Sequence, residues 1–102
     1  MNSFILLGKI IDRTELKETS SGNKYRELVV REKRPYRNAE GEYDYDTHEI
    51  TLWKTLASED YPVGQDVMIR GRIQSYDYMK DEKMYHNPQL VAERVAFFEQ
   101  AV

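Results

Sequence analysis

Side chains that carry out catalysis or hold metal ions are sparse in this sequence of 102 residues. The two histidines, His48 and His86, each lack a companion at metal-ligand spacing, and there is no cysteine to supply a thiolate. Neither a Gly-x-x-x-x-Gly-Lys phosphate loop nor a nucleophile elbow is present. Acidic residues alternate over 40–46, a pattern that suits a hard cation but more commonly keeps an exposed strand edge soluble. The sequence therefore predicts a protein that is not an enzyme and has no metal site and no cofactor.

Charge is distributed unevenly along the chain, although the net charge is only −3. Residues 23–37 contain six lysines or arginines against two glutamates, whereas residues 38–60 contain seven acidic residues against one lysine. A basic stretch can contact phosphates even in an acidic protein. A solvated surface of mixed charge is the alternative interpretation of the same pattern.

Aromatic side chains are frequent, and eight of them are tyrosines, which combine an apolar ring with a polar tip. Trp53 shares the predicted outer face of its strand with Glu49 and Thr51, where a ring either covers a neighbouring element or stacks on a ligand. The cations on the outer faces of neighbouring predicted strands are Arg31, Lys33, Arg70 and Arg72. Rings set among cations are typical of single-stranded nucleic-acid binding, and rings chosen for packing within a sheet are the alternative.

Five predicted strands position these side chains, and they cover residues 4–11, 25–33, 45–53, 66–76 and 90–98. Gly8 indicates a sharp bend or a close backbone approach in the first strand. Arg34-Pro35 is expected to end the second strand, because proline cannot donate to the ladder. One or two helical turns are expected over residues 55–60, and a polar loop over residues 77–88.

Alternation along these strands separates an inner from an outer face. The apolar residues expected to face inward are Leu28, Val30, Ile50, Leu52, Val67, Ile69 and Ile73. The last segment fits a helical face as well as a strand, and we assign a strand because four closely spaced strands need a partner to close a barrel. The predicted fold is all-β, a single domain of residues 1–102 built as a five-stranded barrel, with a short helical segment between the third and fourth strands.

Short motifs follow one another in order over nearly the whole chain. They are Leu7-Gly8-Lys9, Thr14-Glu15-Leu16, Thr19-x-Ser21-Gly22, Arg34-Pro35-Tyr36-Arg37-Asn38, Glu40-Gly41-Glu42, Thr51-Leu52-Trp53-Lys54, Gly71-Arg72-Ile73-Gln74 and Val91-Ala92-Glu93-Arg94-Val95-x-Phe97. In this order they resemble the bacterial single-stranded-DNA-binding protein family. The resemblance implies that the barrel is an OB-fold and that the protein is non-catalytic and oligomeric.

The resemblance also implies roles for particular residues. The base-stacking aromatics of the family correspond to Tyr36, Trp53 and Tyr78. The cations expected to contact phosphates are Arg31, Lys33, Arg34, Arg37, Lys54, Arg70 and Arg72. Thr47 replaces a further aromatic that the family has just before His48, and His48 matches a subunit-contact position. We therefore expect a homo-oligomer, a dimer or a tetramer, that binds single-stranded DNA non-specifically in replication, recombination or repair.

Three departures from the family pattern modify these expectations. The segment 54–70 is shorter than usual, Glu32 stands where an apolar residue is usual, and no acidic tail follows the barrel. Recruitment of repair proteins through a tail is therefore not expected. The absence of cysteine and of a signal peptide favours a cytoplasmic protein without a membrane partner.

Alternative functions remain open at this stage. One is a primosomal replication protein N-like accessory factor, although residues 34–36 and 71–74 fit that family less well. Another is an OB-fold module for protein interaction that has lost DNA binding, which the acidic net charge and Thr47 favour. Binding of RNA is a third, since nothing in the sequence recognises or excludes a 2′-hydroxyl.

Overall fold

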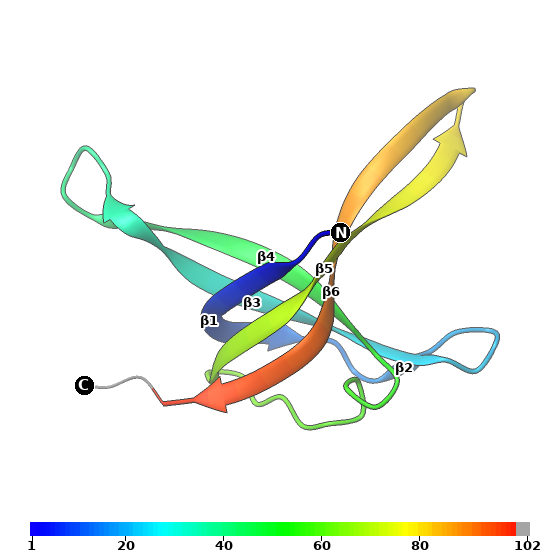
Figure 1. Ribbon diagram of the computed structural model, residues 1–102, viewed down its shortest axis with the longest axis horizontal. Coiled ribbons are helices and arrows are strands. Elements are labelled where there is room, and N and C mark those ends of the chain that lie inside the picture. Colours follow the sequence, from blue (N-terminus) through cyan, green and yellow to red (C-terminus); the bar gives the residue numbers. More distant parts are fainter. Residues whose placement is uncertain (100–102) are drawn as a thin grey trace.

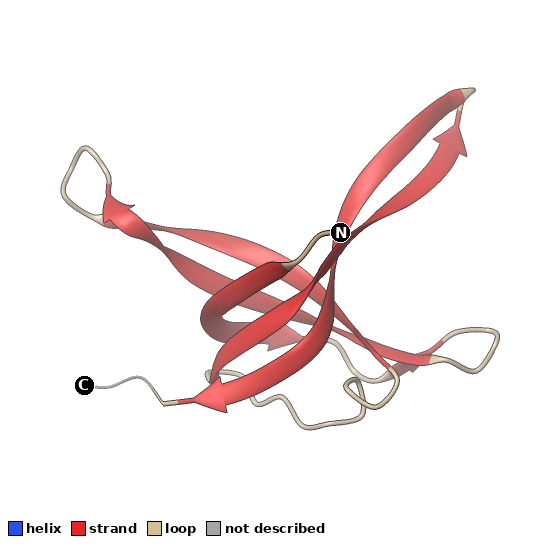
Figure 2. Ribbon diagram, in the orientation of Figure 1, coloured by secondary structure: helices blue, strands red, loops and turns tan. Residues whose placement is uncertain are grey.

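The computed structural model describes residues 1–99, and this part of the chain consists of strands and turns without a helix (Figure 2). The strands are β1 (Phe4–Arg13), β2 (Lys17–Glu18), β3 (Lys24–Arg37), β4 (Tyr43–Trp53), β5 (Asp66–Lys80) and β6 (Lys83–Phe98). Consequently, no segment among the described residues is a long apolar helix of the kind that spans a membrane. The predicted domain end at residue 102 lies outside the described residues.

The five longer strands close into a barrel (Figure 1). They are paired in the order β1-β5-β6-β4-β3, and β1 also pairs with β3, which completes the ring. Neighbouring strands are antiparallel except β4 and β6, which run parallel at the pairs Ile50–Leu90 and Thr51–Val91. The predicted five-stranded all-β barrel is confirmed, and so is the assignment of its last segment as a strand.

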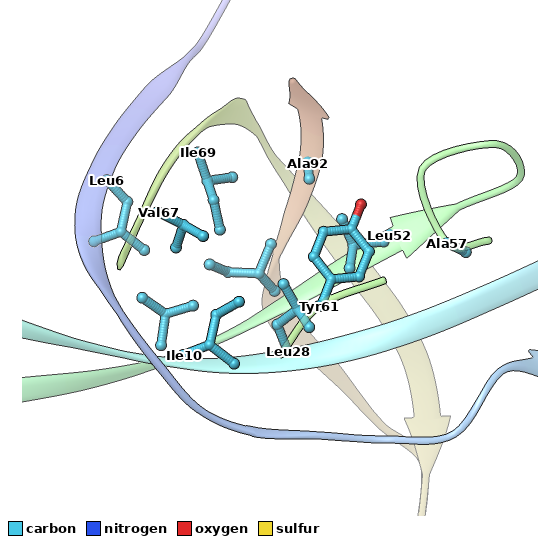
Figure 3. Packing of buried hydrophobic residues seen from close by; sticks show 11 residues of the cluster. Leu6, Ile10, Leu28, Leu52, Ala57, Tyr61, Val67, Ile69 and Ala92 are labelled. Carbon is cyan, nitrogen blue, oxygen red and sulfur yellow. The ribbon is translucent and has the colours of Figure 1, made fainter. Parts of the chain in front are cut away.

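The barrel interior is filled by alternate side chains from these strands (Figure 3). Predicted inner residues that are 0% exposed are Leu28, Val30, Ile50, Leu52, Val67 and Ile69. Tyr61 and Ala57, which come from the segment between β4 and β5, are completely buried against the same cluster. Burying each large apolar side chain contributes about 1.5–3 kcal/mol, so this cluster is the main source of stability.

The inward position predicted for Ile73 is wrong, because this side chain is 43% exposed. The pairing of β1 with β5 reaches only as far as Phe4 and Gly71. Beyond Gly71, β5 has no β1 residue beside it, and the face that was interior becomes open to solvent.

Two glycines allow strands to pass close to one another. An added Cβ at Gly8 would lie 2.6 Å from the carbonyl oxygen of Arg31, so the close backbone approach predicted at Gly8 is confirmed. At Gly71, an added Cβ would collide with the carbonyl oxygen of Val91. Neither position accepts a side chain without movement of a backbone.

A β-bulge explains why the last predicted strand also fitted a helical pattern. Between the pairs Arg70–Arg94 and Gly71–Ala92, β6 has one residue more than β5. Alternation therefore changes face at this point, and Ala92 before the bulge and Val95 after it both pack against the core.

Two hairpin arms extend from the barrel, one formed by β3 with β4 and the other by β5 with β6 (Figure 1). The polar loop predicted over 77–88 is wrong, since the two strands stay paired as far as Lys80 and Lys83. Asp81 and Glu82 make the turn with φ of 52° and 63°, as a type I′ hairpin requires. Because neither residue is glycine or asparagine, the sequence lacks the usual hairpin signal here.

The strand end predicted at Arg34-Pro35 is also wrong, because β3 continues to Arg37. The register of β3 against β4 shifts between Lys33 and Arg37. Pro35 falls within this interruption, where the ladder does not need its missing donor.

The helix expected over residues 55–60 is replaced by hydrogen-bonded turns. Side chains donate hydrogen bonds to carbonyl oxygens of this segment: Arg26 donates to Glu59 O at 3.1 Å, and Tyr61 Oη donates to Leu56 O at 2.5 Å. Arg13 donates to the carbonyl oxygen of Tyr61 at 2.9 Å. These bonds hold the segment against the barrel end in place of a helical ladder.

Candidate nucleic-acid interface

The β3–β4 hairpin brings the basic and the acidic stretches of the sequence side by side. The two strands are antiparallel, with Arg31 opposite Thr47 and Lys33 opposite Tyr45. Successive side chains point to opposite faces, so the hairpin has an inner face that continues the barrel core and an outer face. The charges of each face therefore have to be considered separately.

On the inner face of the arm, Arg34 and His48 have acidic partners. Arg34 donates to Asp46 through Nε at 3.0 Å and Nη2 at 2.8 Å, and Asp44 lies 3.9 Å from its Nη1. The hydrogen bond with Asp46 raises the pKa of Arg34, and the same bond lowers the pKa of Asp46. His48 Nε2 lies 3.0 Å from Glu32 Oε1, which gives this glutamate a polar partner beside the core.

On the outer face, cations lie over tyrosine rings. Cζ of Arg31 is 4.1 Å from the ring centroid of Tyr45, and Nζ of Lys33 is 4.4 Å from that of Tyr43. Cζ of Arg37 lies 5.1 Å from the same Tyr43 ring. Tyr43 and Tyr45 are 37% and 48% exposed, so this face presents both positive charge and aromatic surface to solvent.

A groove continues from this outer face onto β1. Lys9 of β1 is the cross-strand neighbour of Arg31, and both line the groove together with Leu7 and Tyr45. Lys9 also forms an ion pair with Asp66 at 3.5 Å. The groove therefore extends over a third strand, where Asp66 offsets the charge of Lys9.

Trp53 lies at the far end of β4 from Tyr43. Its ring is 37% exposed and tilts against Tyr25, with the ring centroids 5.1 Å apart. The predicted outer position of Trp53 is confirmed, since the ring is not part of the buried cluster. Lys54 follows it as an exposed residue with a φ of 56°.

Tyr78 lies on the other arm, within a ladder of tyrosines. It stacks on Tyr85 with ring centroids 5.3 Å apart and an interplanar angle of 15°, and Tyr76 lies 5.7 Å away. Nζ of Lys83 is 5.3 Å from the centroid of Tyr85. This arm therefore repeats the combination of rings and cations seen on the first arm.

The three predicted stacking residues are distant from one another. Tyr36 is 61% exposed near the tip of the β3–β4 arm, whereas Trp53 is at the barrel end of the same arm. About ten residues of strand separate these two levels, which corresponds to roughly 30 Å. Tyr78 is on the opposite arm (Figure 1).

Arg70 and Arg72 are on a different part of the barrel. Arg70 lies opposite Arg94 of β6 and opposite Ile5 of β1. Arg70 and Arg72 line a shallow pocket together with Asn2 and the acidic Glu93. The arginines of β5 and β6 thus form a second cationic area, separate from the β3–β4 arm.

Sequence reasoning missed Tyr25, Tyr43 and Tyr45 as surface aromatics of this interface. A signal was present, because Tyr43 and Tyr45 have the same parity as Trp53 along β4. Lys9 and Arg94 were also missed, since only strand pairing brings them beside the predicted cations. Within residues 1–99 there is no cluster of three or more potential metal ligands.

A closed five-stranded barrel with arms that carry exposed rings and cations defines an OB-fold of the kind that binds single-stranded nucleic acid. Residues 1–98 match the model of the single-strand binding protein family, and the chain belongs to that family.

Curated relatives agree with this assignment. The chain is 28% identical over 103 residues to single-stranded DNA-binding protein 3 of Listeria innocua, covering 97% of this chain and 64% of the relative. It is also 28% identical over 102 residues to single-stranded DNA-binding protein B of Bacillus subtilis, covering 96% of this chain and 90% of the relative. The chain thus spans less than two thirds of the length of the Listeria protein.

Solved structures confirm the fold. A deletion mutant of the single-stranded DNA binding protein from Thermus aquaticus matches with a TM-score of 0.79 at 21% identity, over 97% of this chain and 51% of that chain. The Plasmodium falciparum SSB in complex with single-stranded DNA matches with a TM-score of 0.74 at 14% identity, over 97% and 96%.

Proposed function

We propose that this chain binds single-stranded DNA without sequence preference and protects or organises it during replication, recombination or repair. The observation that carries the proposal is the outer face of the β3–β4 arm, where Arg31 and Lys33 lie over exposed tyrosine rings. Such a surface suits a ligand that offers aromatic bases and phosphates together. Its relatives named as single-stranded DNA-binding proteins support the same substrate. The proposal assigns no catalytic residue, and it places the protein in the cytoplasm with its substrate.

The proposed contacts follow from the sequence and from their positions. Tyr36, Trp53 and Tyr78 are the proposed stacking residues, and they lie on β3, β4 and β5. The cations proposed to contact phosphates are Arg31, Lys33, Arg37, Lys54, Arg70 and Arg72, with Arg34 the weakest because Asp46 already neutralises it.

We propose that the protein acts as a homo-oligomer. The outer side of β1 exposes an apolar row, Ile5, Leu7 and Ile11, at 69%, 55% and 40%. Lys9 interrupts this row between Leu7 and Ile11, so the row borders the cationic groove described above. Rows of this kind mark protein contacts. His48, whose side chain is 30% exposed, remains a proposed contact residue.

An OB-fold module for protein interaction is the second candidate function. The ion pairs of Arg34 with Asp46 and Asp44 favour it, because they remove positive charge from the arm. Binding of single-stranded DNA is expected for the first function and not for the second.

A titration with oligo-dT at several salt concentrations tests the proposal. We expect tight binding at low salt and a log–log slope of roughly −0.7 per phosphate neutralised. Duplex DNA of the same length is the control, and we expect it to bind more weakly because its bases cannot stack on the rings. Absence of oligo-dT binding at low salt would leave the protein-interaction module as the better function.

A further inference from the structure

The cations of the outer β3–β4 face cover the rings that a base would occupy. Arg31 lies over Tyr45 at 4.1 Å, and Lys33 lies over Tyr43 at 4.4 Å. Both rings are nonetheless partly open to solvent. In the free protein, each ring therefore already has a cation on it, and each cation already has a partner.

The register of the hairpin explains this arrangement. Arg31 is directly opposite Thr47, whose small side chain does not fill the space across the ladder. The guanidinium of Arg31 instead reaches diagonally to Tyr45, two residues further toward the arm tip. Two residues of strand correspond to about 7 Å, so the Tyr45 ring lies about 7 Å closer to the arm tip than Thr47 does.

We infer that Tyr45 and Tyr43 are base-stacking residues that cations cover in the free protein, Arg31 over Tyr45 and Lys33 with Arg37 over Tyr43, and that single-stranded DNA moves these cations from the rings to its phosphates. This inference rests on the proposed function. It adds two stacking residues to Tyr36, Trp53 and Tyr78, and the family motifs did not indicate these two.

The exchange leaves no group without a partner. A base takes the place of the cation on the ring, and a phosphate takes the place of the ring beside the cation. Salt weakens the contact between cation and phosphate much more than it weakens the stack. The cation should therefore assist binding at low salt and compete with the base for the ring at high salt.

Replacement of Arg31 tests this competition. Arg31→Gln removes one phosphate contact but also uncovers Tyr45. We expect its log–log salt slope to be shallower than that of the wild type, so that Arg31→Gln binds oligo-dT more weakly at low salt. The plots of log affinity against log salt concentration for the two proteins should therefore cross. At salt concentrations above the crossing, the variant should bind roughly two- to fivefold more tightly than the wild type, which is the range expected for loss of one exposed cation–π contact.

Arg70→Gln is the matched control. Arg70 is a proposed phosphate contact on the barrel, and its guanidinium lies over none of the rings for which cation–π contacts occur among residues 1–99. The log–log salt slope of Arg70→Gln should become shallower in the same way. Its affinity should nevertheless stay below that of the wild type at every salt concentration and only approach it at high salt. Crossing in both variants, or in neither, would overturn the inference.

Tyrosine variants test the stack itself. Tyr45→Ala should weaken oligo-dT binding roughly fivefold or more at every salt concentration, whereas Tyr45→Phe should bind like the wild type because the ring remains. Circular dichroism should show an intact fold for both, since Tyr45 lies outside the buried cluster. Normal binding by Tyr45→Ala would overturn this inference and leave the proposed function standing. A wild-type chain that ignores oligo-dT would overturn both.

Discussion

Lys33 and Arg34 are neighbours in the sequence but have different electrostatic environments. Lys33 lies on the outer face over the Tyr43 ring, whereas Arg34 makes two hydrogen bonds to the Asp46 carboxylate on the inner face. Binding of a phosphate by Arg34 has to compete with this carboxylate. A cation in this strand is thus available to DNA only if its face has no acidic partner.

Lys33→Gln should therefore affect DNA binding more than Arg34→Gln. We expect Lys33→Gln to reduce the salt slope by roughly 0.7, the value for one phosphate on a single strand. The reduction for Arg34→Gln should be smaller, and in an Asp46→Asn background it should increase because the arginine is then free. Equal slopes for the two single variants would contradict the assignment of these cations to different faces.

At this scale, the sequence predicted the faces of most barrel residues, with Ile73 as an exception, but not their partners. Alternation correctly placed Trp53 and Arg31 outside and Ile50 inside, because a strand repeats every two residues. The pairing of Arg34 with Asp46 depends on the register between two strands, and a shift by one residue changes it. For the same reason, the contact between Arg31 and the Tyr45 ring is visible only in the structure.

Among the elements, the segment between β4 and β5 differs most from its predicted form. It contains Tyr61, which is completely buried, packs against Phe97 at 5.9 Å and donates a hydrogen bond to Leu56 O. Burial raises the pKa of Tyr61 to about 12. The side chain therefore acts as a neutral core residue at ordinary pH.

Ionisation of Tyr61 should make the fold less stable in strong alkali. The pKa of this group is higher in the folded than in the unfolded chain, so its contribution is complete below pH 10 and is lost as the pH rises toward about 12. We expect the free energy of unfolding to fall by on the order of 3 kcal/mol through this group. Tyr61→Phe isolates the effect, because it removes this titration and leaves the other tyrosines in place. Parallel stability curves for Tyr61→Phe and the wild type above pH 10 would show that Tyr61 does not contribute in this way.

Prediction of the elements succeeded inside the barrel and failed in the arms. Each barrel strand has one buried face, and burial leaves an alternating pattern in the sequence, as in residues 45–53. The β5–β6 arm has no core to bury against, and its Asp81-Glu82 turn lacks the glycine that would mark it. Residues 77–88 therefore have the composition of a loop although they form paired strands.

For the whole molecule, the exposed apolar row on β1 is the feature that most suggests a partner, because a monomer would leave it in contact with water. Ile5 and Leu7 point away from the core, on a strand whose other side is buried. A second copy of the chain that covers this row would remove it from water, which supports the oligomer proposed above.

Leu7→Asp should shift the protein toward the monomer. Light scattering at micromolar concentration should give more than one 12.1 kDa chain per particle for the wild type and one chain for the variant. The fold should survive, because Leu7 is 55% exposed. Met79→Asp is the control, since Met79 is a similarly exposed apolar residue on the β5–β6 arm, beyond the last pair of β5 with β1. A monomeric wild type would contradict the proposed oligomer and the contact role of His48.

The whole surface also explains how a chain with a net charge of −3 suits an anionic ligand. Part of the acidic charge is used on the inner face of the β3–β4 arm, where Asp46 and Asp44 pair with Arg34. The outer face keeps Arg31, Lys33 and Arg37 beside aromatic rings. The distribution of charge over the two faces thus matters more than its sum.

The most direct test of the account is binding of oligo-dT by Trp53→Ala. Trp53 is the only tryptophan, so its fluorescence in the wild type reports on this one site. Anisotropy of a labelled oligo-dT allows the same measurement on the variant. We expect the wild-type fluorescence to be quenched on binding and Trp53→Ala to bind roughly tenfold more weakly or worse, with an unchanged circular dichroism spectrum, because one stacked base contributes about 1–3 kcal/mol. A folded Trp53→Ala that binds as tightly as the wild type would contradict base stacking on Trp53. A wild type that does not bind oligo-dT at low salt would contradict the proposed binding of single-stranded DNA.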